Sequence, residues 1–310
     1  MNTQSNAMPE TLGSQGTAPA TMSVTRPMYW AIRREVSEYR SIYIAPLAAA
    51  GAALLGFLIS MRGLPHRMGG LSTLHSAHQR ESIAQPYDIA SAVMMATMIL
   101  VTVFYCADGL YGERRDRSIL FWKSLPVSDL TTVLSKASIP FVVLPLLTFA
   151  ITVALQFLML LLSSAVLLAR GMNVATLWAQ LSVIQMWLLL LYHLLTAHTL
   201  WPAPVYCWIL LVSGWARRAT LLWAALPIVA IAGVERLVFQ TSHFAALVGN
   251  RFIGATPSAA LATPDTFPTD PMTHITPGGF LSTPGLWIGL VIAAVFLAAA
   301  VRLRRYQGPI

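Results

Sequence analysis

Long apolar runs alternate with shorter polar segments along this 310-residue chain. A segment that crosses a hydrocarbon core needs about 20 apolar residues. Five runs reach about this length, at residues 42–60, 88–108, 139–168, 177–213 and 219–237, and a sixth, shorter run lies at 286–301. Because each crossing segment in lipid must satisfy its own backbone hydrogen bonds, the runs predict helices rather than strands. The pattern therefore predicts an all-α integral membrane protein with six transmembrane helices.

The fourth apolar run is interrupted. Residues 177–200 are apolar, Pro202 and Pro204 follow, and residues 205–213 are apolar again. Proline removes a helical hydrogen bond and kinks a helix. One interpretation is a single kinked span, and the other is a span followed by a re-entrant half-helix. We favour the kinked span, because it keeps the number of crossings at six.

The residues before the first run have a different pattern. Residues 26–41 carry aromatic and aliphatic side chains at helical spacing, with charged side chains on the other faces. This pattern predicts an amphipathic helix that lies in the membrane interface. Residues 1–25 are polar, without an apolar core, and predict a disordered cytosolic tail rather than a signal peptide.

Composition supports the membrane assignment. Hydrophobic residues make up 56% of the chain and charged residues only 10%, against about a quarter charged in soluble domains. The net charge of +8 follows the ends of the apolar runs, without the motifs of a nucleic-acid-binding protein. Cys106 and Cys207 lie in or near apolar runs and indicate no disulfide framework.

The distribution of Lys and Arg predicts an orientation. With six crossings, most of these residues fall on the side that holds both termini. By the positive-inside rule, that side is the cytosol. We therefore expect a multi-pass protein of the cell inner (plasma) membrane with both termini cytosolic. Its six-span domain covers residues 42–305, with a cytosolic loop at 109–138 and outer loops at 61–87 and 240–284.

The cytosolic loop contains the segment GERRDRSILFWKSLPVSDLTTVLSK, residues 112–136. Ser128 is a favourable N-cap. Asp129 in the first turn and Lys136 in the last turn are the charges that the dipole of a helix between them favours. Pro126 ends any preceding helix. The loop therefore predicts a short capped helix at 128–137, directly before the third span. Its apolar face would consist of Leu130, Val133 and Leu134.

This layout resembles the permease subunits of type-2 ABC exporters. Those proteins have an amphipathic interfacial helix, six spans and a loop between the second and third spans. The loop carries an acidic residue, an "slP(v/i)s" turn, a short coupling helix and a lysine. Glu113, the SLPVS sequence at 124–128 and Lys136 match these features. The resemblance covers about residues 26–305.

The resemblance implies that the loop docks on a separate ABC ATPase subunit. The residues expected at that contact are Glu113, Arg114, Asp116, Arg117, Pro126, Ser128, Asp129 and Lys136. It also implies a second permease copy, most simply in a homodimer surrounded by lipid. The chain has no Gly-x-x-x-x-Gly-Lys-Ser/Thr motif. We therefore expect it to be no enzyme and to bind no cofactor itself, with ATP and Mg²⁺ held by the partner ATPase.

Polar side chains inside the predicted spans are candidates for a substrate path. They are His193 and His198 in the fourth span, with Gln156 and Gln185. Packing or hydrogen bonding between helices is the alternative role for each. In a regular α-helix, residues five apart point about 140° away from each other. The two histidines are therefore not expected to share a metal ion, and the sequence predicts no metal site.

Two other functions remain open at the level of sequence. An ion-coupled secondary transporter would need acidic residues at membrane depth and paired broken helices. The runs show no such acids and only one broken region, which disfavours this function. A membrane scaffold without transport activity would have no evident use for a capped cytosolic helix.

Overall fold

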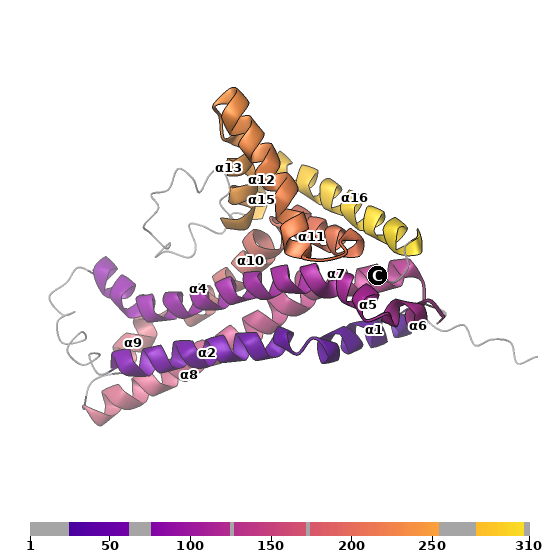
Figure 1. Ribbon diagram of the computed structural model, residues 1–310. Coiled ribbons are helices and arrows are strands. Elements are labelled where there is room, and N and C mark those ends of the chain that lie inside the picture. The colour runs from indigo at the N-terminus through magenta and orange to yellow at the C-terminus, as the bar shows by residue number, and fades with distance from the viewer. Residues whose placement is uncertain (1–24, 62–75, 125–126, 172–173, 254–276, 307–310) are drawn as a thin grey trace, which may run out of the picture.

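The computed structural model describes residues 25–61, 76–124, 127–171, 174–253 and 277–306. All regular elements in these ranges are helices (Figure 1). Six helical segments are long and apolar enough to cross a membrane: Ser41–Ser60, Ile83–Arg115, Asp129–Ala169, Val183–Leu200, Thr220–Phe239 and Pro284–Tyr306. The predicted all-α architecture with six candidate spans is confirmed, and it indicates a multi-pass membrane protein.

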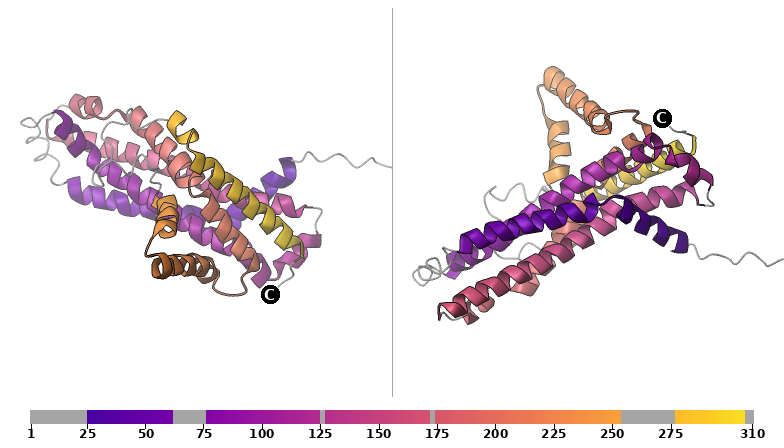
Figure 2. Two further views of the ribbon diagram at one scale, coloured as in Figure 1. Left: turned by 90° about the horizontal axis from the view of Figure 1, so that it is seen from above. Right: turned by 60° about the horizontal axis from the view of Figure 1, so that its bottom comes forward.

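Three long helices form one side of the bundle. They are α2 (Ser41–Ser60), α4 (Ser76–Gly109) and α8 (Leu144–Ala169), which lie side by side along the long axis (Figures 1 and 2). Buried Phe57, Met94 and Met159 belong to the apolar core between them. Helix α4 begins twelve residues before the predicted span, so the end of the predicted 61–87 loop is helical. The remainder of that loop, residues 62–75, lies outside the described residues.

Short helices gather at one end of the bundle, which we call the charged end (Figure 1). Helix α1 (Thr25–Glu38) lies there, together with α5 (Tyr111–Arg115), α6 (Ser118–Ser124) and α7 (Asp129–Ser138). The Ser128 hydroxyl accepts the Thr131 N–H at 3.1 Å and caps α7. A π-helical turn, η2 (Ile139–Val143), connects α7 to α8 without a loop. Helices α1 and α7 thus occupy most of residues 26–41 and 128–137, and the interfacial and coupling roles expected for them stay predictions.

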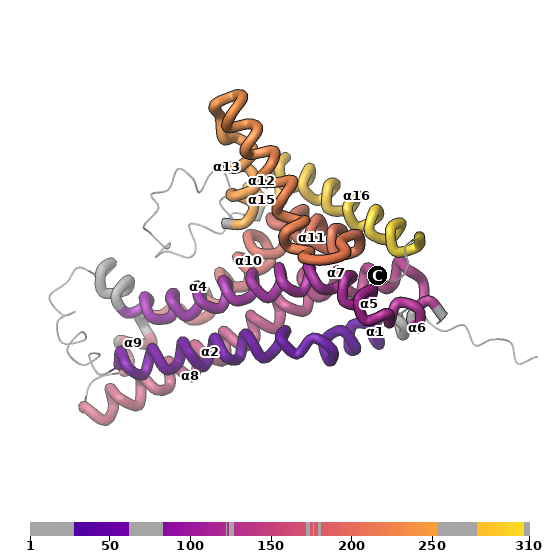
Figure 3. The backbone as a smooth tube through the Cα atoms, viewed as in Figure 1, coloured from indigo at the N-terminus to yellow at the C-terminus, as the bar shows by residue number. Residues whose placement is uncertain are grey.

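The interrupted fourth run forms α9 (Ala175–Gln180), α10 (Val183–Leu195), the π-helical turn η3 (Thr196–Leu200) and α11 (Ala203–Trp215). These follow one another from the opposite end of the bundle towards the charged end (Figure 3). This course agrees with one kinked span. Because Pro202 has no N–H, the carbonyl of His198 loses its helical donor. The Tyr206 hydroxyl replaces it at 3.1 Å.

Arg251 satisfies a second carbonyl at the break. The Val205 N–H bonds to Pro202 rather than to Trp201, and the Trp201 carbonyl accepts from Arg251 Nη1 at 2.9 Å. The guanidinium also lies 4.2 Å from the centre of a Trp201 ring and donates to the Gly285 carbonyl. Arg251 belongs to α13 (His243–Ile253), and Gly285 to α16 (Pro284–Tyr306). One side chain therefore connects α13, α16 and the kink.

Helix α12 (Thr220–Phe239) projects from the bundle (Figure 1), and most of its side chains are exposed. Its Glu235 carboxylate accepts the N–H groups of His243 and Phe244 and caps α13. The segment predicted as an outer loop at 240–284 thus contains helix α13, and also α15 (Pro277–Leu281). Residues 254–276 lie outside the described part of the chain.

We predict that Arg251→Met lowers the thermal midpoint of the detergent-purified chain. The substitution leaves the carbonyls of Trp201 and Gly285 without their donor, at a cost of about 1–3 kcal/mol. The matched control is Arg236→Met, because Arg236 is exposed on α12. Equal midpoints for the two variants would show that Arg251 does not stabilise the kink.

Candidate functional site

Five ionised side chains from four helices meet at the charged end, and we call them the buried ion cluster. Glu35 comes from α1, Glu113 from α5, Asp129 and Lys136 from α7, and Arg304 from α16. All except Asp129 are buried, with exposed fractions from 1% for Lys136 to 6% for Arg304. These groups are far apart in the sequence, so the cluster depends on the tertiary fold.

The charges alternate through the cluster. Lys136 Nζ lies 2.8 Å from Glu35 Oε1 and 3.1 Å from Glu113 Oε1. The other oxygen of Glu113 accepts from Arg304 Nη1. Arg304 Nε then donates to Asp129 Oδ1 at 3.2 Å. Each cation therefore lies between two carboxylates, which offsets part of the cost of removing it from water.

Two tyrosines complete the surroundings of Glu35. The Tyr105 hydroxyl donates to Glu35 Oε2 at 3.0 Å. The Tyr39 ring lies edge-on to the Tyr105 ring, with 5.0 Å between centroids, and its hydroxyl donates to the Asp108 carbonyl at 3.4 Å. Burial, and the nearby charges of Asp108 and Glu35, raise the pKa of Tyr39 above its ordinary value. Its hydroxyl therefore keeps its proton and remains a donor.

Gly112 allows the corner between α4 and α5 to approach α1. A Cβ atom there would lie 3.2 Å from both the Tyr39 hydroxyl oxygen and Asp108 Oδ2. That distance is shorter than normal van der Waals contact, so a side chain would push the corner away from Tyr39. Position 112, directly before Glu113, therefore has no room for a side chain.

Arg114 anchors the same corner to the fourth span. Its Nη1 donates to the carbonyls of Gly214 at 2.7 Å and Ala216 at 3.2 Å, at the end of α11. The Leu110 N–H donates to Ser213 Oγ at 3.3 Å. Hydrogen bonds and ion pairs therefore connect the α4–α5 corner to α1, α7, α11 and α16.

The residues expected at an ATPase contact occupy different environments. Glu113, Arg114 and Lys136 are buried, and Asp129 is partly buried. Asp116, Arg117 and Ser128 are exposed. Pro126 lies outside the described residues.

Asp116 and Arg117 form the exposed turn that connects α5 with α6. A hydrogen bond from Arg115 lowers the pKa of Asp116, and Arg117 adopts a left-handed backbone with φ of 57°.

The apolar residues of α7 also differ in their exposure to solvent. Val133 is completely buried against the bundle, whereas Leu130 and Leu134 are 54% and 40% exposed. The sequence places all three on one face, and the structure separates that face into a buried part and an exposed part. The exposed leucines, with Ser128, give the charged end an accessible amphipathic surface.

The sequence pattern alone does not mark Glu35, Tyr105 or Arg304 as site residues. One signal for Glu35 was present: it lies three residues after Ile32 and four before Tyr39, next to the apolar face of α1. Arg304 is the first residue of an Arg-Arg pair at the end of α16, and nothing in the local sequence separates it from Arg305.

The candidate substrate-path histidines line one cavity of about 360 Å³ between α4 and α10, together with Asp88 and Ser91. Both histidines therefore reach the same cavity, although residues five apart in a regular α-helix would point about 140° away from each other. The π-helical turn η3 has more residues per turn than an α-helix, so residues five apart move towards the same side.

The candidate glutamines differ from each other. Gln156 is buried in α8 and donates to Ser91 Oγ at 2.8 Å and to the Tyr87 carbonyl at 3.3 Å, which joins α8 to α4. Gln185 is partly buried and is not among the residues that line the cavity.

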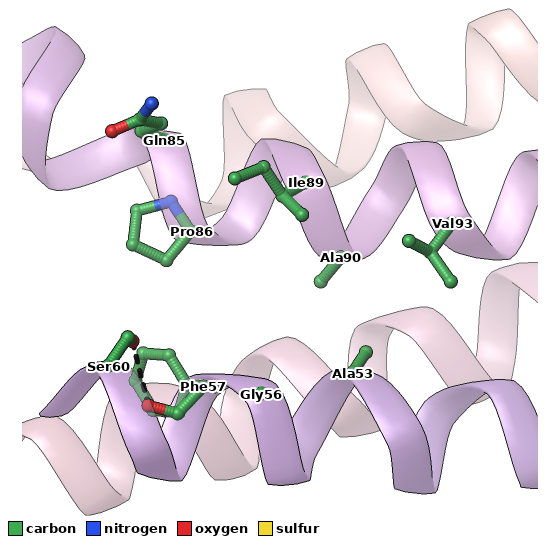
Figure 4. A pocket seen from close by; sticks show the side chains of 9 residues that line it. All are labelled: Ala53, Gly56, Phe57, Ser60, Gln85, Pro86, Ile89, Ala90 and Val93. Atoms are coloured by element: carbon green, nitrogen blue, oxygen red, sulfur yellow. Dashed lines mark hydrogen bonds between the residues drawn. The ribbon is translucent and has the colours of Figure 1, made fainter.

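A second cavity, of about 390 Å³, lies between α2 and α4 near the opposite end (Figure 4). The cavity exists because small residues such as Ala53, Gly56 and Ala90 line it. The Ser60 hydroxyl donates to the Phe57 carbonyl at 2.8 Å and is therefore already hydrogen-bonded. The described residues that line this cavity carry no charge. Apart from the Gln85 amide and the Ser60 hydroxyl, its lining is apolar.

Within the described ranges, no group of three or more His, Cys, Asp or Glu side chains could hold a metal ion. Comparison with models of known protein families, with curated proteins and with solved structures finds no match to the chain. The physical organisation of the charged end is therefore the main guide to function.

We predict that Arg304→Met destabilises the chain by about 3–5 kcal/mol, because Asp129 loses its cation, Glu113 keeps only Lys136, and the buried cluster is left with an uncompensated negative charge. The neighbouring Arg305→Met provides the matched control, since Arg305 is exposed. Thermal unfolding in detergent compares the two variants. A midpoint for Arg304→Met as high as that of Arg305→Met would contradict a structural role for the ion cluster.

Proposed function

We propose that the chain is the permease subunit of an ABC transporter, an exporter powered by a separate ATPase subunit that docks at the charged end. The observation that carries this proposal is the buried ion cluster. It fastens α7, a short capped helix with exposed leucines, to α1, α5 and α16. A helix that received force from a partner would need such an attachment.

The path of force follows from the connections of α7. The helix continues through η2 into α8, so a displacement of α7 moves one span directly. Through Lys136 and Asp129 it also moves α1, α5 and α16. In the proposed complex, ATP and Mg²⁺ are bound by the partner ATPase, and this chain contributes mechanical coupling rather than chemistry.

The proposal also includes the orientation of the chain, the roles of α1 and α7, and a second permease copy. The charged end faces the cytosol of a plasma membrane, which places both termini inside. The interfacial role belongs to α1 and the coupling role to α7. A second permease copy completes the transport path, and lipid surrounds the dimer.

An ion-coupled secondary transporter is the second candidate. Asp88 is an acidic side chain within a candidate span, and the fourth span is broken at Pro202. Both are features that such transporters use. Dependence of transport on the ATPase separates the two functions.

We predict that Leu130→Glu with Leu134→Glu abolishes association with the ABC ATPase subunit of the proposed complex. The two leucines supply exposed apolar surface on α7, and two carboxylates there would oppose docking. The matched control is Leu247→Glu with Leu281→Glu, two exposed leucines in α13 and α15. Co-purification in detergent measures the effect. Full retention of the ATPase by the α7 double variant would contradict the docking surface.

We also predict that Glu113→Gln preserves ATPase association but reduces ATP-driven transport at least tenfold. The amide keeps the shape of the side chain and removes the charge between Lys136 and Arg304. Asp116→Asn is the control, since Asp116 is exposed and three residues away. Reconstituted vesicles measure ATP hydrolysis and transport together. Unchanged transport would contradict the coupling role, and transport driven by an ion gradient without the ATPase would favour the second candidate.

A further inference from the structure

The cavity between α4 and α10 is elongated. Helix α4 lines it with residues from Asp88 to Ile99, and α10 with η3 lines it with residues from Met186 to His198. At 1.5 Å of rise per residue, the α4 stretch covers about 16 Å. The volume of about 360 Å³ is in the range of small-molecule sites. The shape therefore suits a narrow ligand that lies parallel to the helices.

Asp88 provides the ionisable carboxyl group in this lining. Among the residues with described side chains, none forms an ion pair or hydrogen bond with it. A carboxylate within an apolar span is costly to keep unpaired, which makes it a candidate for ligand binding. The nearby Ser91 does not compensate, because its hydroxyl donates to the Tyr87 carbonyl at 3.0 Å.

His193 adds a second acceptor. Its Nδ1 lies 2.9 Å from the Leu189 carbonyl oxygen, which can only accept, so Nδ1 carries the proton of this hydrogen bond. In the neutral ring, Nε2 is then an acceptor. Asp88 and His193 thus both provide acceptors, and a ligand that binds them must donate.

Apart from Asp88, Ser91, His193 and His198, the lining is apolar and adaptable. Met95, Ile99, Met186 and Leu190 line the cavity. Methionine side chains adjust to ligands of irregular shape. The lining therefore combines one anionic group with an apolar surface long enough for a hydrocarbon or aromatic body.

We propose that this cavity binds an amphipathic ammonium compound, with the amino group at Asp88 and the apolar body extending towards Ile99. The inference deepens the proposed function, because it names the substrate class of the permease. The ammonium could belong to a free amphipathic amine or to the headgroup of an aminolipid. The recognition chemistry is the same for both sources.

The test uses the full chain in phosphatidylcholine nanodiscs, without an ATPase. The ligand is dansylcadaverine, a fluorescent primary amine, and its control is the alcohol in which a hydroxyl replaces the amino group. Fluorescence anisotropy measures both affinities. We expect the amine to bind at least tenfold more tightly than the alcohol, and Asp88→Asn to remove this preference. Asp108→Asn is the matched control, because it removes an acid from the far end of the same helix.

Equal binding of amine and alcohol by the wild-type chain would overturn the proposal, even if Asp88→Asn failed to fold. Unchanged amine binding by a folded Asp88→Asn variant would overturn it as well. A second variant, Met95→Trp, fills the apolar part of the cavity and is expected to weaken binding at least tenfold.

Nanodiscs that contain phosphatidylethanolamine distinguish the two sources. Competition by this lipid, lost in Asp88→Asn, identifies a headgroup site, and absence of competition identifies a site for free amines. Either result supports ammonium recognition. Because binding is measured without the ATPase, its failure leaves the docking proposal intact, and failure of docking leaves the binding result intact.

Discussion

The position of Lys136 between Glu35 and Glu113 is the constraint on which the charged end depends. An ammonium group that is 1% exposed is stable there only while both carboxylates stay close. This requirement fixes α1 and α5 relative to α7. Arg304 extends it to α16 through Glu113 and Asp129. Four helices that the chain joins only through long segments are therefore held as one unit by buried charge.

The same rule explains the break in the fourth span. Proline frees backbone carbonyls, and a buried carbonyl requires a donor. Tyr206, one turn further along the same run, and Arg251 of α13 supply the donors, so the kink is stabilised both locally and by a neighbouring helix. The charged end and the kink thus use one principle: polar groups removed from water are paired with groups from other helices.

The sequence predicted features that depend on local spacing. Six apolar runs predicted six candidate spans, and Ser128 with Asp129 predicted the start of α7. It did not predict the ion cluster, because Lys136 is 101 residues from Glu35, and Glu113 is 191 residues from Arg304. Local sequence also treats His193 and His198 as residues of a regular helix, whereas η3 alters their relative direction. Pairing across helices and local helix irregularities require the tertiary structure.

Helix α4 connects the two parts of the proposed function. Asp88 lines the cavity in the first half of this helix, and Tyr105 near its last turn donates to Glu35 in the ion cluster. Helix α5, which carries Glu113, follows after Leu110. A displacement of the cluster would therefore move α4 along or about its axis, and would shift Asp88 relative to α10. Because packed interiors transmit strain, the proposed function would couple the cavity to the charged end through α4.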